Sequence, residues 1–227
     1  MNNARNVTDL TEFTYEDCKV RFDTDHAAKI YSKRHLTSRK GKQEQVCIQK
    51  ALADLPKNTL VLDLPCGTGR LTFFIKNLGF RVVGADYSQH MIKYAKQQPL
   101  FIPELKHTLS FEQQDVMAIT HADRSFGATV CNRLFHHYGT SALRQRALKE
   151  LSRVTDGPII VSFFNSHSLG AQWRRLLNFV RRRKPLDRVP IPFSVFKKDV
   201  EASGLKVQAV FYPRYLFSPQ TYLKLSK

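Results

Sequence analysis

The sequence predicts an α/β protein with a doubly wound, mostly parallel sheet that ends in an antiparallel C-terminal hairpin. Short β-type apolar segments alternate with amphipathic helical segments from residue 59 to residue 204, which is typical of parallel sheets covered by helices. The stretch VLDLPCGTGR (61–70) interrupts an apolar run with two glycines one threonine apart, indicating a strand, a tight turn and a helix N-terminus. The last two apolar segments are joined by a connection too short for a helical crossover, so we expect them to pair antiparallel.

Each element follows from its own local pattern. Apolar runs bounded by turn residues predict strands at 59–65, 80–86, 109–115, 126–137, 157–165, 205–213 and 216–227. Apolar residues at helical spacing predict helices at 25–57 (broken within the basic segment 31–44), 70–78, 88–98, 142–154 and 193–204. We expect Ser88 to cap the helix at 88–98 and Gly204 to end the helix at 193–204.

Two parts of the chain lie outside this alternation. Residues 1–57 are predicted to form a helical, basic cap segment, of which about the first twenty residues are polar and expected to fray; residues 58–227 form the main domain. Within it, 167–192 is interpreted as an inserted lid. One face of the lid is apolar and the other basic, with the apolar positions at Leu169, Trp173, Leu176, Leu177 and Val180.

Composition limits the classes of function. The 227 residues carry a net charge of +17, which favours anionic partners such as nucleic acid, acidic lipid headgroups or a phosphorylated substrate. No segment approaches the ~20 apolar residues of a membrane span, and the N-terminus lacks a signal-peptide pattern, so we expect a cytoplasmic protein. The four cysteines are scattered singly, which argues against a disulfide framework and a zinc ribbon, and we expect no metal site.

Three carboxylates indicate which ligand the glycine turn holds. Asp63 lies in the first predicted strand just before the turn. Asp86 ends the next predicted strand, 23 positions after Asp63, which matches the ~20-residue offset of a ribose-binding acid. Asp115 closes the third predicted strand, where it can accept a hydrogen bond from an adenine amino group. A dinucleotide-binding turn would carry a third glycine, and a Walker turn would carry G-K-[ST]; this chain has neither.

The motifs VLDLPCGTGRLT, VVGADYS, FEQQDV and FGATVCNRLFHHY, in this order, resemble those of class I S-adenosylmethionine-dependent methyltransferases. The resemblance covers roughly residues 25–227. It is strongest to the D-x-x-C-G-T-G branch, which includes quinone C-methyltransferases and many small-molecule enzymes. It implies a Rossmann-like fold, S-adenosyl-L-methionine as the cofactor, and methyl transfer as the reaction.

The same resemblance implies roles for individual residues. The backbone at Gly67 and Gly69 would approach the methionine part of the cofactor, with Asp63 orienting its amino group. Asp86 and Tyr87 would contact the ribose, and Asp115 and Val116 would contact the adenine. Asn132 and Arg133 would lie beside the sulfonium. Tyr31 and Arg39, from the N-terminal segment, are expected to close over the cofactor carboxylate.

His136 and His137 are the candidate catalytic bases, because imidazole titrates near neutral pH. Alternatively, the pair packs structurally, and Tyr138 is a candidate for the acceptor wall. The [ND]-P-P-[YFW] loop of amino-methylating enzymes is absent after the fourth predicted strand. We favour a small-molecule or lipid-like acceptor, with the basic lid at an anionic membrane surface. RNA as the acceptor and a non-catalytic, cofactor-binding adaptor remain the alternatives.

Overall fold

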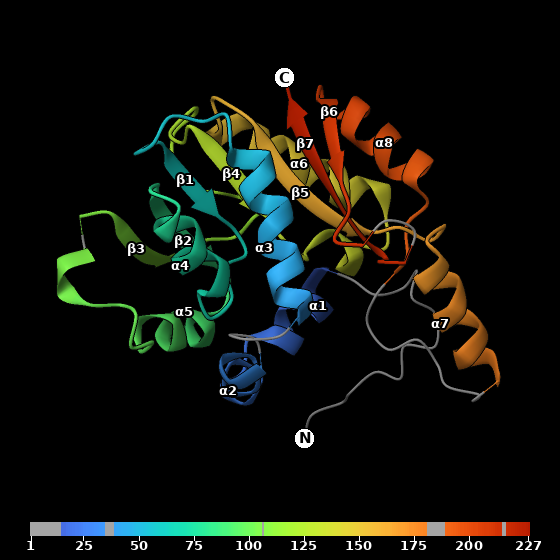
Figure 1. Ribbon diagram of the computed structural model, residues 1–227, viewed down its shortest axis with the longest axis horizontal. Helices are drawn as coiled ribbons and strands as arrows, with labels where there is room; N and C mark the ends of the chain where they lie inside the picture. Colours follow the sequence, from blue (N-terminus) through green and yellow to red (C-terminus); the bar gives the residue numbers. More distant parts are fainter. Residues whose placement is uncertain (1–14, 35–38, 106, 181–188, 215–216) are drawn as a thin grey trace.

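The computed structural model describes residues 15–34, 39–105, 107–180, 189–214 and 217–227. Its centre is a sheet with the strand order β3-β2-β1-β4-β5-β7-β6 (Figure 1). The strands are β1 (Leu60–Asp63), β2 (Arg81–Asp86), β3 (Leu109–Gln113), β4 (Ala128–Cys131), β5 (Ile159–Phe164), β6 (Lys206–Phe211) and β7 (Gln220–Ser226).

Strand directions agree with the predicted mixed sheet. The pairs β1–β2, β2–β3, β1–β4 and β4–β5 are parallel, whereas β7 is antiparallel to both of its neighbours, β5 and β6. The chain winds outward from β1 through β2 to β3 and then returns to place β4 on the other side of β1. The gap outside the carboxyl ends of β1 and β4 is therefore the switch point at which such sheets bind ligands.

Alternate residues of the strands face two separate apolar cores. On β1, Val61 belongs to the core beneath α3, α4 and α5, and Leu62 belongs to the core beneath α6 and α8. Ile160 and Val161 divide in the same way on β5. The result is a three-layer arrangement, because each buried strand presents apolar side chains to helices on both faces.

The helices agree with the predicted pattern over most of the chain. Ser88 caps α5, its hydroxyl accepting a hydrogen bond from the Met91 amide (3.3 Å). The helices are α1 (Tyr15–Phe22), α2 (Asp25–Arg34), α3 (Arg39–Leu52), α4 (Arg70–Asn77), α5 (Gln89–Lys96), α6 (Ser141–Val154), α7 (Leu169–Val180) and α8 (Phe193–Ala202), with short 3₁₀ turns η2 (Pro103–Leu105) and η3 (Phe135–His137).

Two elements differ from the prediction. The strand expected at 126–137 ends at Cys131, and the chain then turns into η3, because Arg133 adopts a left-handed φ of 63° that a strand cannot continue. The frayed segment expected before residue 20 instead contains α1, which packs beside α2 at one end of the molecule (Figure 1). Tyr15 and Phe22 on α1 are half-buried, which explains the second difference, since burial stabilises a helix that is polar elsewhere.

Part of the predicted lid is a helix. In Figure 1, α7 extends away from the sheet, and its Trp173 side chain is 62% exposed. Residues 181–188 lie outside the described part of the chain. The segment returns beside β5, where the Val189 amide donates to the His136 carbonyl (2.8 Å) and the Ile191 amide to the Phe164 carbonyl (2.7 Å). In the ranges that the structure describes, no helix is both long and apolar enough to cross a membrane.

Candidate functional site

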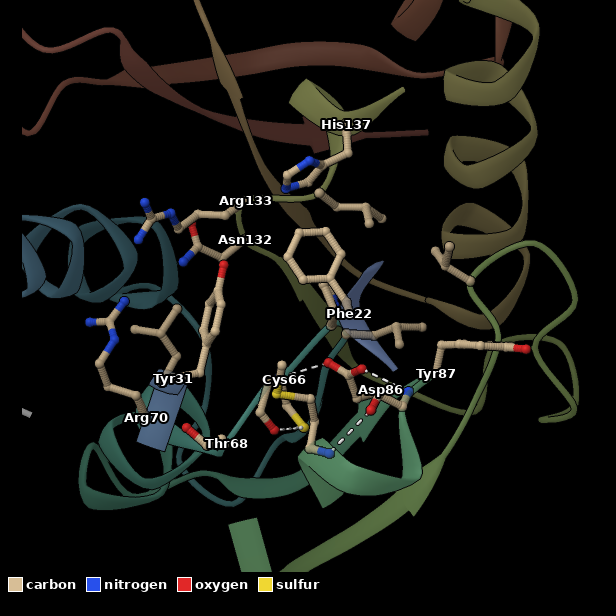
Figure 2. Close-up of a pocket in the computed structure, with 18 of the residues that line it drawn as sticks. Phe22, Tyr31, Cys66, Thr68, Arg70, Asp86, Tyr87, Asn132, Arg133 and His137 are labelled. Atoms are coloured by element: carbon tan, nitrogen blue, oxygen red, sulfur yellow. Dashed lines mark hydrogen bonds between the residues drawn. The ribbon is translucent and has the colours of Figure 1, made fainter. Parts of the chain in front are cut away.

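A large cavity opens at the carboxyl ends of β1, β2 and β4. The cavity and its open mouth together span about 1410 Å³ of space that no protein atom fills. The sheet contributes the loops after these three strands, and α1 and α2 contribute the opposite wall (Figure 2).

The glycine turn forms one edge of the cavity. Gly67 lines it with φ 55°, and a Cβ at this position would meet no atom within 4 Å, so the backbone faces open space. Gly69, with φ 85°, is not among the lining residues. A Cβ there would lie 2.9 Å from Phe111 and 3.0 Å from Phe73. Gly67 thus leaves room for a ligand, whereas Gly69 lets the turn pack onto the core.

Asp86 lies at the end of β2 and faces the cavity. Its two carboxylate oxygens accept hydrogen bonds from the amides of Gly67 (2.9 Å) and Ser88 (3.0 Å), which hold the side chain in one orientation. Burial raises the pKa of Asp86 to about 6, against the opposing effect of the two amide donors. Each oxygen keeps a second lone pair, so the group can still accept from two ligand hydroxyls.

Asp63 lies beneath the turn and is not among the lining residues. It is fully buried, its Oδ2 accepts a hydrogen bond from the Thr72 hydroxyl (2.6 Å), and its Oδ1 has no hydrogen-bond partner among the described residues. Burial raises the pKa of Asp63 to about 7. The structure therefore places this carboxyl beside the glycine turn but behind the cavity surface.

Asn132 lines the cavity at the end of β4 and is oriented by a buried network. Its Oδ1 accepts hydrogen bonds from Ser162, Gln220 and Tyr222, each at 2.9 Å. The Ser162 hydroxyl itself accepts from the Arg133 amide (2.8 Å), so its own proton is free to point at Asn132. Because Oδ1 is occupied in this way, the group that Asn132 presents to the cavity is its Nδ2 amide donor.

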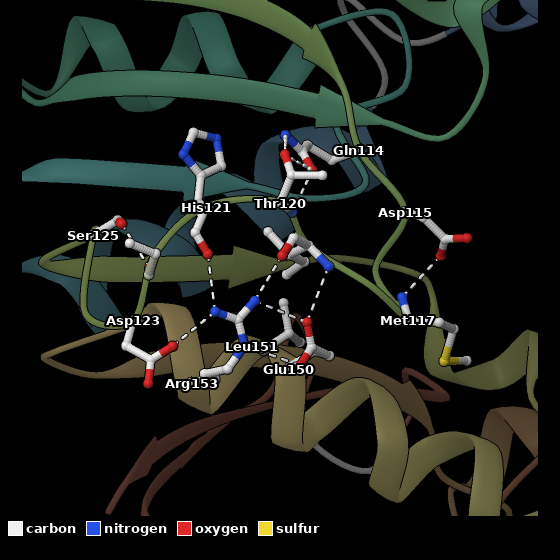
Figure 3. A network of polar contacts seen from close by, with 12 residues as sticks. Gln114, Asp115, Met117, Thr120, His121, Asp123, Ser125, Glu150, Leu151 and Arg153 are labelled. Carbon is white, nitrogen blue, oxygen red and sulfur yellow. Dashed lines mark hydrogen bonds and ion pairs between the residues drawn. The ribbon is translucent and has the colours of Figure 1, made fainter.

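The loop after β3 forms a further wall, and a network on α6 holds it (Figure 3). The Arg153 guanidinium donates to the carbonyls of Ile119 (2.6 Å) and His121 (2.9 Å), and Glu150 accepts from the Ile119 amide (3.0 Å). Gln114 and Val116 reach the cavity from this loop. Two cavity-lining side chains thus depend on contacts more than thirty residues away in sequence.

Asp115 lies on the same loop but is not a lining residue. Its carboxylate accepts hydrogen bonds from the Tyr15 hydroxyl and the Met117 amide (2.8 Å), and it pairs with Lys19 (3.2 Å). Burial and the neighbouring Asp115 raise the pKa of Tyr15. This carboxylate, expected at the adenine, fastens α1 to the loop, and the lining residues beside it are Gln114 and Val116.

The two histidines both line the cavity but lie in different surroundings. The His136 ring stacks flat on Phe164 (centroids 4.2 Å apart, planes at 5°) and is 1% exposed. His137 is 9% exposed and meets the Phe22 ring edge to face at 5.0 Å. Figure 2 shows His137 directed at the open cavity. The geometry favours His136 as a packing residue and His137 as the residue that can meet a ligand.

The N-terminal helices supply residues that sequence reasoning missed. Tyr15, Lys19 and Phe22 on α1 line the cavity together with the predicted Tyr31 on α2. Their spacing of four and three residues places them on one face of a helix, which is the signal that could have identified them. Tyr87, also predicted, lies against Lys19, whose ammonium is 4.6 Å from the ring centroid. The side chain of Arg39 lies outside the described part of α3.

The predicted residues thus separate into two groups. The cavity brings together Tyr31, Gly67, Asp86, Tyr87, Val116, Asn132, Arg133, His136 and His137. Asp63, Gly69 and Asp115 lie behind its surface. The lining combines a fixed carboxylate, an amide donor, an imidazole and several aromatic rings, which suits a ligand with hydroxyls and an apolar body.

The central part of the chain matches a known family. Residues 61–156 match the family model described as a methyltransferase domain. A putative methyltransferase YqeM of Bacillus subtilis (strain 168) is 37% identical over 78 residues, which are 34% of this chain and 30% of that protein. The probable tRNA methyltransferase 9B of Mus musculus is 26% identical over 107 residues, which are 47% of this chain and 22% of that protein.

Solved structures share the fold over almost the whole chain. The magnesium protoporphyrin IX methyltransferase of Synechocystis PCC 6803, whose crystal structure has bound SAH, superposes with a TM-score of 0.73 at 16% identity, covering 93% of this chain and 99% of that one. The chain matches less than a third of the length of the two curated relatives above. Together these findings confirm the expected Rossmann-like fold and show a match to a methyltransferase domain over residues 61–156.

Proposed function

We propose that this methyltransferase domain binds S-adenosylmethionine in the cavity and transfers its methyl group to a small-molecule or lipid-like acceptor. The observation that carries the proposal is Asp86, held by the amides of Gly67 and Ser88 with two lone pairs facing the cavity. The methyltransferase-domain match, and solved structures of the same fold with bound SAM or SAH, support S-adenosylmethionine as the cofactor.

The residues present fit this cofactor. The open space at Gly67 accepts a ligand against the backbone, and Asp86 can accept from both hydroxyls of a ribose. Gln114 and Val116 offer a polar and an apolar contact to a base. Asn132 directs its amide donor at the same space. When bound, the cofactor supplies a methyl group on a sulfonium that is already activated for transfer.

The protein's own contribution is alignment and proton removal. The residues on the loops after β1, β2 and β4 would orient the methyl donor. The aromatic side chains of Phe22, Tyr31 and Tyr138 would exclude water and position an apolar acceptor. His137, directed at the cavity beside Phe22, would take the proton of the attacking atom. His136, stacked on Phe164, would hold η3 in place.

The acceptor class rests on the shape and chemistry of the lining. Phe22, which contacts the His137 ring, and the side chains of Leu134 and Tyr138 line the cavity, which favours an acceptor with an apolar body. RNA is the second candidate, favoured by the net charge of +17 and by the tRNA methyltransferase named among the relatives. A non-catalytic adaptor is the third. The cytoplasmic location expected from the N-terminus stays a prediction.

Residues 167–192 are proposed as a cap that also contacts an anionic membrane surface. Both ends of the segment lie beside the cavity wall, one following β5 and the other bonded to the His136 carbonyl. Leu169 and Trp173 are 46% and 62% exposed, and Phe217 nearby is 56% exposed. Exposed apolar side chains next to a basic sequence suit an interfacial helix.

Cofactor binding is tested by calorimetry. The wild type should bind S-adenosylmethionine, and Asp86→Ala should weaken binding by ~1.5–3 kcal/mol or more, because two hydrogen bonds to a carboxylate are lost. Glu104→Ala, a carboxylate on η2 that is not a lining residue, is the matched control and should bind as the wild type does. Undiminished binding to Asp86→Ala would defeat the assignment of Asp86.

The two histidines are tested separately once an acceptor is in hand. His137→Ala should reduce turnover ~10²–10⁴-fold with little change in cofactor affinity. His136→Ala should instead lower the free energy of unfolding, because it removes a stacked, buried ring. Equal loss of stability and turnover in His137→Ala would support a packing role for both residues.

Titration with anionic vesicles and with RNA, in parallel and at several salt concentrations, separates the acceptor classes. Replacing Arg181, Arg182 and Arg183 with Gln should weaken vesicle binding steeply at low salt. The matched control replaces Lys197, Lys198 and Lys206, which are exposed on α8 and β6, and removes the same charge elsewhere. Absence of vesicle binding, or equal loss in both variants, would remove the membrane role.

A further inference from the structure

The Asn132 side chain is held from beneath by polar side chains of two neighbouring strands. Its Oδ1 accepts hydrogen bonds from Ser162 on β5 and from Gln220 and Tyr222 on β7, each at 2.9 Å. The Gln220 Nε2 also donates to the Tyr222 hydroxyl (2.7 Å), which joins the two β7 residues. Ser162 and Tyr222 are fully buried, and Gln220 is 6% exposed. The support of Asn132 is therefore part of the sheet and closed to solvent.

This network fixes which end of the Asn132 amide faces the cavity. The Tyr222 hydroxyl accepts from Gln220 and the Ser162 hydroxyl accepts from the Arg133 amide, so the proton of each hydroxyl is left for Oδ1. In the reversed orientation, Nδ2 would take the place of Oδ1, 2.9 Å from the Gln220 Nε2, and two N–H donors would face each other. Asn132 lines the cavity at the end of β4, beside Arg133 (Figure 2). Its Nδ2 donor therefore faces the ligand space.

A fixed N–H donor needs a lone pair from the ligand that it meets. A sulfonium carries a positive charge and is a poor partner for a donor, so the partner belongs to the second ligand, the methyl acceptor. A hydroxyl oxygen has two lone pairs. One can attack while the other accepts from Nδ2, and the hydroxyl proton can pass to His137 on the same wall of the cavity.

A neutral amine does not fit the same donor. It has one lone pair, which the attack uses, and its hydrogens would point at another N–H group. An amine acceptor would need an oxygen at this position, and the Asn132 oxygen is turned away from the cavity by its three donors. The orientation of one side-chain amide thus discriminates between two classes of acceptor.

We propose that Asn132, positioned by Ser162, Gln220 and Tyr222, selects an acceptor whose reactive group is a hydroxyl or its oxyanion, as in a phenol or an enol. The proposal rests on the proposed function and deepens it, because it names the reactive group. Phe22 and Tyr138 line the same cavity and suit the flat, apolar body of such an acceptor. The three supporting side chains are positioning residues, which act through Asn132.

The first experiment compares two probes of nearly equal shape, p-nitrophenol and p-nitroaniline. The wild type is first saturated with S-adenosylhomocysteine, whose thioether carries no charge. It should bind p-nitrophenol about tenfold or more tightly than p-nitroaniline. Because an N–H donor stabilises the phenolate, bound p-nitrophenol should also ionise at a lower pH than the free probe, which its visible absorption reports. Equal binding of the two probes, or binding of neither, would overturn the proposal.

The second experiment reverses the amide from beneath. Gln220 is not a lining residue, so Gln220→Glu leaves the cavity surface unchanged. The new carboxylate would accept from Nδ2, and the Asn132 oxygen would then face the cavity. The preference for p-nitrophenol should fall about tenfold or more, with the affinity for S-adenosylhomocysteine unchanged. Asn132→Asp should have the same effect directly. Gln98→Glu adds the same charge at another lining position and is the control, which should alter the preference less.

The outcomes separate this proposal from the proposed function. If Gln220→Glu weakens both probes equally, the network has only a structural role. If it weakens S-adenosylhomocysteine and leaves the ratio of the probes unchanged, Nδ2 serves the cofactor. Either result overturns the proposal while the proposed function stands. If Gln220→Glu does not fold, as judged by circular dichroism, Asn132→Asp and the wild-type comparison decide. If the wild type does not bind S-adenosylhomocysteine, the proposed function fails, and the proposal fails with it.

Discussion

The cavity has two sides that are stabilised in different ways. The floor, formed by the loops after β1, β2 and β4, carries Asp86 and Asn132, which are 8% and 7% exposed and held by buried hydrogen bonds. The cover, formed by α1 and α2, carries half-buried Tyr15, Phe22 and Tyr31. Asp115 ties α1 down through Tyr15 and Lys19.

Because of this difference, the floor should determine the stability of the domain, whereas the cover should control the access of ligands to the cavity. The floor is part of the cooperative sheet, so disturbing its supports should lower the free energy of unfolding of the whole domain. The cover depends on a few partly exposed contacts, and such segments open at a small fraction of the global unfolding free energy. We therefore expect the cover to admit ligands while the floor stays formed.

The largest expected effect concerns a support of the floor. Arg144 on α6 forms a buried ion pair with Asp199 (2.6 Å) and donates to the carbonyls of Tyr138 (2.9 Å) and Gly139 (3.2 Å), just after η3. Arg144→Met leaves Asp199 buried without its cation, which should lower the free energy of unfolding by about 3–5 kcal/mol in urea titrations.

The double variant Arg144→Met/Asp199→Leu is the control for Arg144. It removes both charges, so much of the lost stability should return. A single variant as stable as the wild type would contradict the assignment of this pair to the floor. Loss of stability in the double variant equal to that in the single variant would indicate that the carbonyl contacts matter more than the ion pair.

A smaller effect concerns pH. Burial raises the pKa of Asp63 to about 7, above the value of 3.8 that is usual for an aspartate. The folded protein therefore holds this proton more tightly than the unfolded chain, and the associated stability, complete at low pH, is lost as pH rises toward 7. Asp63→Asn keeps an acceptor for Thr72 but has no group that titrates. Between pH 5 and pH 7 the wild type should therefore lose about 1–2 kcal/mol of unfolding free energy relative to this variant.

The measurement is the free energy of unfolding against pH for both proteins. Asp123→Asn is the control, because the Asp123 side chain is 73% exposed. This variant should follow the wild-type curve more closely. A constant difference between Asp63→Asn and the wild type across this range would show that Asp63 titrates normally.

The smallest effect on stability is expected in the cover. Tyr15→Phe removes the hydroxyl bonded to Asp115 but leaves the Lys19 pair, so the global free energy of unfolding should fall by about 1 kcal/mol or less. Amide hydrogen exchange should nevertheless accelerate several-fold within α1, because its local opening becomes easier. Tyr94→Phe, which removes an exposed hydroxyl contact to Asp25 (3.3 Å), is the matched control. Equal acceleration in α1 and β4 would show that cover and floor open together.

Much of the fold could be predicted because its signals are local. The alternation of strands and helices, the cap at Ser88 and the turn at Gly67 each depend on residues within a few positions of one another. The end of β4 could not be predicted in this way. Leu134 and Phe135 after Cys131 fit a continuing strand, yet the backbone turns at Arg133, whose amide bonds to Ser162.

The sequence by itself determined the floor's chemistry: the glycine turn, the acid at the end of β2 and the polar residues after β4, because a binding turn requires particular residues at short spacing. Only the tertiary structure decided which side chains face the ligand. Tyr15 reaches Asp115 across 100 positions, and Glu44 joins Arg70 to Arg133. Contacts at such separations arise when helices pack on the completed sheet. The periodicity of the sequence indicates that a helix has a face to bury, but it does not indicate which residue that face will contact.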